Sequence, residues 1–203
     1  MKTLSEIDTT SKRATRGAGF SWGIAEEVGK NMRLLELYGL PGIKNLNKFL
    51  KDYKEKQFQK ITLISETNYA SKNPFCPITL GTNFIDQVNL LDKKLNIQIS
   101  NLAFPILFIP FVSRASEIVG KKIFLKVDDK EFLFNLNQSI YSNYLKNEIL
   151  ENCNNINISF LENNNSFNED EWKELYKLSE DTFVEETESL KIDAAGAGLT
   201  DND

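Results

Sequence analysis

The longest apolar run in this 203-residue chain, Leu102 to Val112 (LAFPILFIPFV), constrains its fold more than any other feature. The run is too short to cross a bilayer, because a membrane-spanning helix needs about 20 residues. It also contains Pro105 and Pro110, so it predicts a buried pair of strands or another core segment. Apolar residues make up 41% of the chain and charged residues 26%, which is typical of a globular protein.

The first quarter of the chain carries helix signals. Thr3 and Glu6 form a capping box ahead of a first helix, which Gly17 to Gly19 interrupt. A second helix is expected over Ser21 to Tyr38, with the serine as its N-cap, and a third over Ile43 to Tyr53. The N-terminal quarter is therefore predicted to be helical.

The middle of the chain is typical of β-structure, with one helix expected before its last strand and one after it. Two helices are predicted, one over Ser139 to Leu150 and one from Asn168 to about Thr182, where Glu171 completes a second capping box. Helices at both ends of a central, mostly antiparallel sheet make the fold class α+β, with an ordered C-terminal tail. The expected strands are Lys60–Ile64, Asn96–Asn101, Ile106–Phe111, Lys122–Val127, Glu131–Leu136 and Asn155–Leu161.

Charge is distributed unevenly along the chain. We expect one α+β domain over residues 1–203, which can be subdivided into a helical part (1–58), a mostly β part (59–161) and an acidic helix and tail (162–203). The last part holds 13 Asp or Glu against 3 Lys, while the rest carries a net charge of +5. This split predicts that the acidic end folds back on the basic part or meets a basic partner.

Several classes of chemistry are excluded by composition. The chain has no histidine, which rules out Ser-His-Asp and Cys-His nucleophiles and every histidine-containing zinc site. Cys76 and Cys153 fit no zinc spacing and are expected to be free thiols. The basic residues form no dense patch interleaved with aromatics, so we expect no nucleic-acid partner. The first residues lack the apolar stretch of a signal peptide, which predicts a cytoplasmic location without a membrane anchor.

A glycine turn precedes the second helix and is flanked by arginines. Backbone N–H groups at such a turn, together with the positive end of the helix dipole, can bind an anion. Arg13 and Arg16 could clamp a carboxylate or phosphate beside Gly17 and Gly19. The alternative is a tight corner between two helices, for which glycines are equally suited.

The second helix adds a carboxylate and a further arginine. Glu26, Lys30 and Arg33 share one helix face at spacings of three and four. Glu26 lies next to the apolar stripe, so we expect it to be partly buried and able to act as a positioned acid or base, with Arg33 holding substrate. A structural ion pair is the alternative.

The segment from Ala195 to Asp203 concentrates small and acidic residues. Its glycines permit close backbone approach, and its carboxylates could dock on arginines. The carboxylates could also ligate a hard cation, but the spacing of a calcium-binding loop is absent and no metal site is predicted. The alternative is a solvated acidic tail. The candidates here are Gly196, Gly198 and Thr200 for substrate binding, and Asp201 and Asp203 for catalysis.

Three segments resemble a bacterial domain family of unknown function. They are RGAGFSWGIAEEVGKNMRLLELYGLPG (Arg16 to Gly42), CPITLGTNFID (Cys76 to Asp86) and DTFVEETESLKIDAAGAGLTDND (Asp181 to Asp203). The most specific motifs are the N-terminal RGAGFSWGIAEE and the C-terminal GAGLTDND. The resemblance implies a bacterial metabolic protein but brings no reaction, cofactor or catalytic residue.

Two functions from different classes follow from these features. The first is an enzyme that acts on a small anionic metabolite, with the arginines as a clamp and Glu26 or a tail carboxylate as acid or base. It requires Ala195–Asp203 and Arg13–Glu27 to form one site. The second is a non-catalytic accessory or structural subunit, whose C-terminal tail docks into a partner or a neighbouring protomer. The sequence predicts neither a cofactor nor an oligomeric state.

Overall fold

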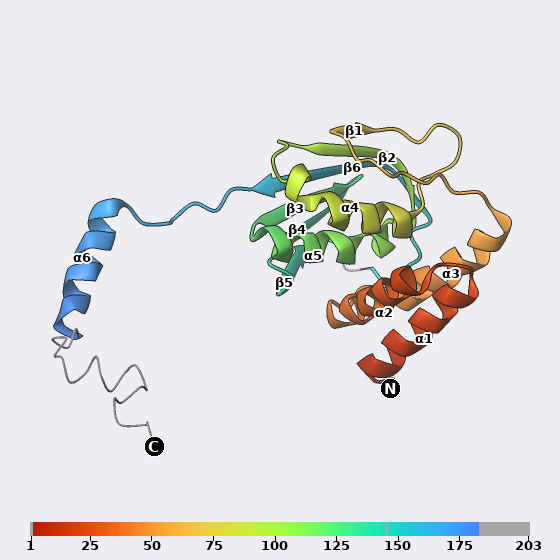
Figure 1. Ribbon diagram of the computed structural model, residues 1–203, viewed down its shortest axis with the longest axis horizontal. Helices are drawn as coiled ribbons and strands as arrows, with labels where there is room; N and C mark the ends of the chain where they lie inside the picture. The colour runs from red at the N-terminus through yellow and green to blue at the C-terminus, as the bar shows by residue number, and fades with distance from the viewer. Residues whose placement is uncertain (1, 145, 183–203) are drawn as a thin grey trace, which may run out of the picture. The chain divides into compact units, whose positions relative to one another are not determined.

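The computed structural model describes residues 2–144 and 146–182 of the chain. The chain divides into two units, residues 1–163 and residues 164–203. The described part has the expected α+β fold, with helices before and after a mostly antiparallel sheet (Figure 1).

Three helices open the first unit, as the sequence predicts. They are α1 (Leu4–Gly17), α2 (Trp22–Leu37) and α3 (Gly42–Glu55). The capping box of Thr3 and Glu6 forms at the start of α1, and Ser21 caps α2 by accepting a hydrogen bond from the backbone of Ile24. The three helices pack together: α2 and α3 contribute side chains to the apolar core, and α1 buries the polar side chains of Ser11 and Thr15.

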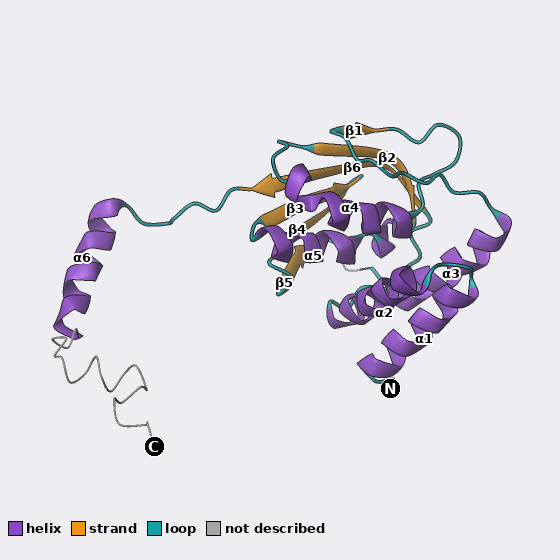
Figure 2. Ribbon diagram, viewed as in Figure 1, coloured by secondary structure: helices purple, strands orange, loops and turns teal. Residues whose placement is uncertain are grey.

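Six strands follow in one sheet of the order β1-β2-β6-β3-β4-β5 (Figure 2). Every pair of neighbours is antiparallel except β1 with β2. β6 pairs with both β2 and β3, so the longest strand lies inside the sheet, where both of its edges are hydrogen-bonded. The strands are β1 (Thr67–Asn68), β2 (Ile97–Ala103), β3 (Lys122–Val127), β4 (Lys130–Asn135), β5 (Ser139–Ser142) and β6 (Asn152–Leu161).

Two further helices cover one face of this sheet. α4 (Pro77–Leu91) and α5 (Ile109–Val119) lie side by side across it (Figure 1). The strands direct Ile99, Leu125 and Ile158 toward the helices, and all three are buried. Gly81 of α4 allows this packing, since a Cβ added there would lie 2.1 Å from the ring of Phe111.

Two of the expected strands are absent. Residues 60–64 form no strand, because their backbone groups bond to side chains of α4: Ile64 donates to Gln87, and Ile61 accepts from Asn83. Residues 106–111 are helical: the 3₁₀ turn η1 (Pro105–Leu107) leads into α5, where Pro110 occupies the first turn. The whole run is nevertheless buried, as a core segment should be.

The helix expected over 139–150 is also absent. Residues 139–142 form the edge strand β5, and the chain beyond it crosses α3. There the buried side chain of Asn45 donates to the carbonyl oxygen of Glu148 and accepts from the backbone of Leu150. These long-range hydrogen bonds replace the ladder of a local helix. Helix α4 was not predicted, although Pro77 lies at its start.

The second unit contains α6 (Glu169–Ser179) and the 3₁₀ turn η2 (Glu180–Thr182). The predicted capping box of Asn168 and Glu171 is present. The C-terminal tail, which was expected to be ordered, lies outside the described residues. None of the described helices is long and apolar enough to cross a membrane.

Candidate functional site

The corner between α1 and α2 holds the arginines and glycines expected to bind an anion. Arg13 and Arg16 lie near the end of α1, and Gly19 has a φ of +101°, a left-handed conformation that favours glycine. The guanidinium of Arg16 donates to the carbonyl oxygen of Phe20 at 2.9 Å and lies 5.5 Å from the ring centroid of Trp22. Arg16 thus stabilises the corner, and an additional role in anion binding stays a prediction.

The same corner directs Phe20 into the core. Gly17 ends α1, and the chain turns so that the Phe20 ring lies 4.5 Å from the ring of Tyr53 on α3. Phe20 is buried in a cluster with Phe49. This geometry serves helix packing, which was the alternative interpretation of the glycine turn.

Glu26 and Arg33 of α2 both point to solvent. The prediction of a partly buried Glu26 is wrong, because the adjacent positions Ala25 and Val28 face the core and Glu26 does not. Within residues 2–144 and 146–182, neither Glu26 nor Arg33 forms an ion pair. Their roles in catalysis and substrate binding stay predictions.

The neighbouring Glu27 makes the ion pairs instead. It pairs with Arg114 of α5 and, at 2.9 Å, with Lys30. Burial raises the pKa of Glu27, but the hydrogen bonds to Lys30 and Arg114 outweigh this effect and leave its pKa below the ordinary value. Arg114 also donates to the buried side chain of Asn31. Sequence reasoning missed this cluster because Arg114 follows Glu27 by 87 residues, and no local spacing links the two.

The C-terminal candidates Gly196, Gly198, Thr200, Asp201 and Asp203 lie outside the described residues. The expectation that they form one site with Arg13–Glu27 therefore stays a prediction.

A cavity of about 410 Å³ opens where the end of α3 meets the start of β6. Its apolar lining comes from Phe58, Pro74 and Phe104. The backbone of Phe104 is left-handed, with a φ of 45°, a conformation that is uncommon for a bulky residue. This turn ends β2 and places the Phe104 ring edge-on to that of Phe49, 5.6 Å away.

The charged residues that line this cavity are Asp52, Lys56 and Glu151, and Lys48 pairs with Asp52 beside it. The side chain of Asp52 is only 6% exposed, and its oxygens lie 3.0 Å from the ammonium of Lys48 and 2.8 Å from that of Lys56. Burial raises the pKa of Asp52, but the hydrogen bonds to Lys56 and Lys48 outweigh it and hold the pKa below the ordinary value. Asp52 is therefore ionised and paired at neutral pH.

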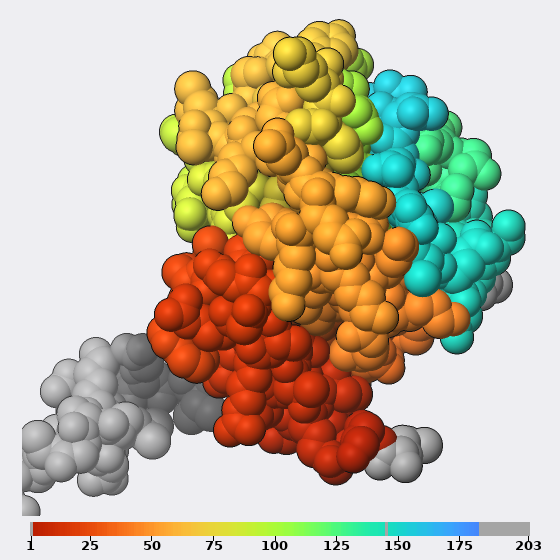
Figure 3. Space-filling view, turned by 90° about the vertical axis from the view of Figure 1, so that its right-hand side faces the viewer, coloured from red at the N-terminus to blue at the C-terminus, as the bar shows by residue number. Residues whose placement is uncertain are grey.

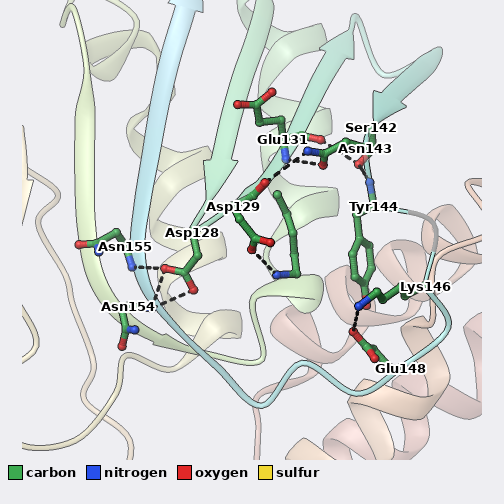
Figure 4. A network of polar contacts seen from close by, with 11 residues as sticks. Asp128, Asp129, Glu131, Ser142, Asn143, Tyr144, Lys146, Glu148, Asn154 and Asn155 are labelled. Atoms are coloured by element: carbon green, nitrogen blue, oxygen red, sulfur yellow. Dashed lines mark hydrogen bonds and ion pairs between the residues drawn. The ribbon is translucent and has the colours of Figure 1, made fainter.

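The hairpin turn between β3 and β4 fixes the start of β6 beside the cavity (Figure 4). Asp128 has a φ of 52°, and its carboxylate accepts hydrogen bonds from the backbone N–H groups of Asn154 and Asn155. Figure 4 shows the side chain of Asn154 extending away from this carboxylate. The backbone of β6 is thus held in place while the side-chain amide of Asn154 stays available at the cavity.

A more open groove of about 450 Å³ lies beside α1. Ile7 and Ile43 line it, and Lys2 and Glu6 at its rim form an ion pair of 3.3 Å with each other. Lys2 and Glu6 thus neutralise each other, while Glu36 adds a negative charge to a groove that is otherwise lined by Ile7, Thr10 and Ile43.

Helix α6 carries an exposed apolar face. Trp172, Leu175 and Leu178 are 48%, 60% and 70% exposed, and none of the residues of α6 is buried. The ring of Phe167 stacks on Trp172, with centroids 5.5 Å apart, and extends the same face. Folded proteins seldom expose this many large apolar side chains together without an interaction partner.

The two cysteines are free and buried. Burial raises the pKa of the Cys153 thiol to about 12, and burial also raises the pKa of Cys76. Both thiols are therefore protonated and shielded, which suits packing rather than nucleophilic chemistry. No group of three or more acidic or cysteine side chains within the described part of the chain could hold a metal ion.

Comparison with known protein families matches the N-terminal part of the chain. Residues 2–76 match the model of a family described as a protein of unknown function (DUF3726). The match covers α1, α2, α3 and β1, and it includes the arginine-glycine corner but not α4, α5 or the rest of the sheet. No curated protein matches the chain. No solved structure matches it either.

Proposed function

We propose that this protein is a non-catalytic binding subunit whose acidic C-terminal segment docks on a partner protein through the apolar face of α6. The observation that carries the proposal is the exposure of Trp172, Leu175 and Leu178 on a helix that has no buried residue. Burying such side chains in a partner's groove removes apolar surface from water, at about 25 cal/mol per Å².

The helix is prepared for such docking by its own sequence. Its capping box satisfies the first free N–H groups, and Glu169, Asp170 and Glu171 in the first turn complement the helix dipole. A helix that is stabilised in advance loses less conformational entropy on binding. Amphipathic helices bind apolar grooves through anchors at such three- and four-residue spacings.

Charge indicates the chemistry of the partner. Residues 162–203 carry a net charge of −10, so a groove that receives α6 is expected to have a rim of lysines or arginines. Ala195–Asp203, the segment first expected to dock, follows α6 in the same acidic stretch.

The enzyme hypothesis has less support from the geometry. The guanidinium of Arg16 is engaged by Phe20 and Trp22, and Glu26 and Arg33 face solvent. An Arg clamp for a small anionic metabolite would need these groups to converge, together with a tail carboxylate. That arrangement stays a prediction.

A first experiment tests the exposure of α6 in the full chain. Trp22→Phe leaves Trp172 as the only tryptophan, so its fluorescence reports this face alone. We expect Trp172 in the isolated monomer to emit as an exposed indole and to be quenched readily by acrylamide. A Trp172 that is shielded in the isolated monomer would contradict the proposal.

A second experiment identifies and tests the partner. A photo-crosslinking residue at position 172 captures the partner in the producing cell, and binding is then measured with the two purified proteins. Trp172→Ser with Leu175→Ser should weaken that binding about 100-fold, as loss of anchor residues does. The control is Glu174→Ser with Lys177→Ser, which keeps Trp172, Leu175 and Leu178 and leaves the net charge unchanged. Equal affinity of the apolar double variant and the wild type would sink the proposal.

A further inference from the structure

The cavity at the end of α3 offers a second candidate binding site, independent of α6. In Figure 3 the end of α3 and the start of β6 lie next to each other on one face of the molecule. Its volume of about 410 Å³ lies within the range of small-molecule sites, which runs from about 300 to 1,000 Å³.

Charges around the cavity largely cancel. Both oxygens of Asp52 are taken by Lys48 and Lys56, and the lysine ammonium groups share that one carboxylate. The hydrogen bond to Asp52 raises the pKa of Lys48, and Glu151, which adds a negative charge at the rim, raises it further. The two lysines and the two carboxylates sum to zero, so the cavity carries no net charge that would favour a strongly anionic or cationic ligand.

The polar groups that remain are amides. Asn101, Asn152 and Asn154 all line the cavity, and within the described residues their side chains form no hydrogen bond. Elsewhere in the same unit asparagine side chains serve the fold: Asn45 donates to Pro41 at 2.7 Å, and Asn83 donates to Ile61 at 2.9 Å. The three cavity amides are thus free to offer both donors and acceptors to a ligand.

The lining between these amides is apolar and partly aromatic. Phe58 belongs to a ring cluster, since it stacks on Tyr53 with centroids 6.0 Å apart and contacts Phe49 at 5.4 Å. Pro74 and Phe104 complete this lining. A cavity whose lining combines an apolar surface with side-chain amides is suited to a flat ring whose edge carries hydrogen-bonding groups.

We propose that this cavity binds a small, uncharged, planar heterocycle with adjacent donors and acceptors on its edge, which is the chemistry of a nucleobase. The ring packs on Phe58 and Pro74, and the amides of Asn152 and Asn154 pair with its edge. Asparagine makes such paired contacts to adenine, where it both donates and accepts.

The test titrates the full-length protein with adenosine at millimolar concentrations and follows backbone amide signals by NMR. We expect shifts at Asn101, Phe104, Asn152 and Asn154. Asn152→Ala with Asn154→Ala should weaken binding about tenfold or more, because two hydrogen-bonding groups are lost. Asn155→Ala, on the same strand but outside the cavity lining, is the matched control and should bind as the wild type does. Asn101→Gly removes the third amide, and glycine readily adopts the φ of 53° at this position.

Three comparison probes decide the ligand class. Ribose lacks the ring, benzyl alcohol has a ring without a heterocyclic edge, and AMP adds negative charge. Adenosine should bind more tightly than ribose or benzyl alcohol, and AMP should bind no more tightly than adenosine. Absence of adenosine binding, shifts confined to another surface, equal binding of either neutral probe, or tighter binding of AMP would each overturn the proposal.

Discussion

Helices α3 and α6 carry the same kind of sequence pattern but have opposite fates. Both alternate charged residues with an apolar face at helical spacing. In α3 that face is buried, through Leu46, Phe49 and Leu50. In α6 no residue is buried. The pattern thus indicates a face that needs an apolar cover, but it does not say whether the cover belongs to the same unit.

The largest expected difference in stability is between two variants, each of which deletes one aromatic ring from the apolar face of α3 or of α6. Phe49→Ala removes a fully buried ring that contacts Tyr53, Phe58 and Phe104, and should lower the free energy of unfolding by about 3–5 kcal/mol. Trp172→Ala removes a ring that is half exposed and should change this free energy by less than about 0.5 kcal/mol. Urea unfolding of both proteins measures the difference. A loss for Trp172→Ala that approaches that of Phe49→Ala would break the comparison.

The next largest effect on stability is expected at the start of α3, because the backbone there lies close to α2. A Cβ added at Gly42 would lie 2.8 Å from the Cβ of Leu35, which cannot move away cheaply in a packed helix. Gly42→Ala should therefore cost about 1–3 kcal/mol. The control is Gly23→Ala on α2, where a Cβ meets nothing within 4 Å and helix propensity should raise stability by up to about 1 kcal/mol. Thermal or urea unfolding should show opposite signs for the two variants, and equal signs would contradict close packing at Gly42.

The buried acid of α3 makes a pH-dependent prediction. The pKa of Asp52 is lower in the folded protein than its ordinary value of 3.8, because its hydrogen bonds to Lys56 and Lys48 outweigh the effect of burial. The contribution of Asp52 to the free energy of unfolding is therefore fully present when the pH is above 3.8, and it is lost as the pH falls through the pKa of Asp52 in the folded protein. Asp52→Asn should cost about 1.5–2 kcal/mol at neutral pH, the lower end of the range for hydrogen bonds to a charged group, because both lysines are partly exposed to solvent.

The measurement for Asp52 is a series of unfolding curves from neutral to acid pH. The free energies of wild type and Asp52→Asn should converge as the pH falls below the folded pKa of Asp52. Glu174→Gln on α6, where no residue is buried, serves as the matched control. Its free energy of unfolding should follow that of the wild type at every pH. A difference between wild type and Asp52→Asn that persists unchanged at low pH would show that the ion pairs are not its source.

Local sequence patterns predicted the capped helices α1 and α6 best. The capping boxes at Thr3 and Asn168 are short patterns whose physical effect is also local, so both helix starts were found from the sequence. β3 and β4 were found because their alternating pattern matches a sheet with one covered face. The fold class followed from the order of these elements.

Elements fixed by distant partners could not be predicted in this way. The run from Ile106 to Phe111 is apolar throughout, so periodicity cannot distinguish a strand from a buried helix. Residues 60–64 have the composition of a strand, yet the amides of Asn83 and Gln87 take the place of a neighbouring strand. The Glu27–Arg114 pair is missed for the same reason, since its partners meet only in the folded chain.

The residues of the candidate site also come together only in the folded chain, so the sequence alone could not identify them as a group. Glycine and arginine content drew attention to the corner at Arg16, where the structure reveals mainly helix packing. The cavity at Asp52 brings together α3, the end of β2 and the start of β6. Its asparagines are spread over more than fifty positions, so no spacing could mark them as a group.

The smallest expected effect distinguishes the two capped helices most sharply. Thr3→Ala removes the cap of α1, which packs against α2, so it should lower the unfolding free energy of the sheet-containing unit by about 0.5–2 kcal/mol. Asn168→Ala removes the equivalent cap of α6 and should leave that free energy unchanged, while NMR secondary shifts over residues 169–179 show reduced helix content. The caps are chemically alike, so any difference reports the surroundings of the helix. If Asn168→Ala destabilises the sheet unit as much as Thr3→Ala, then α6 unfolds together with that core, and its apolar face already has a cover within the chain.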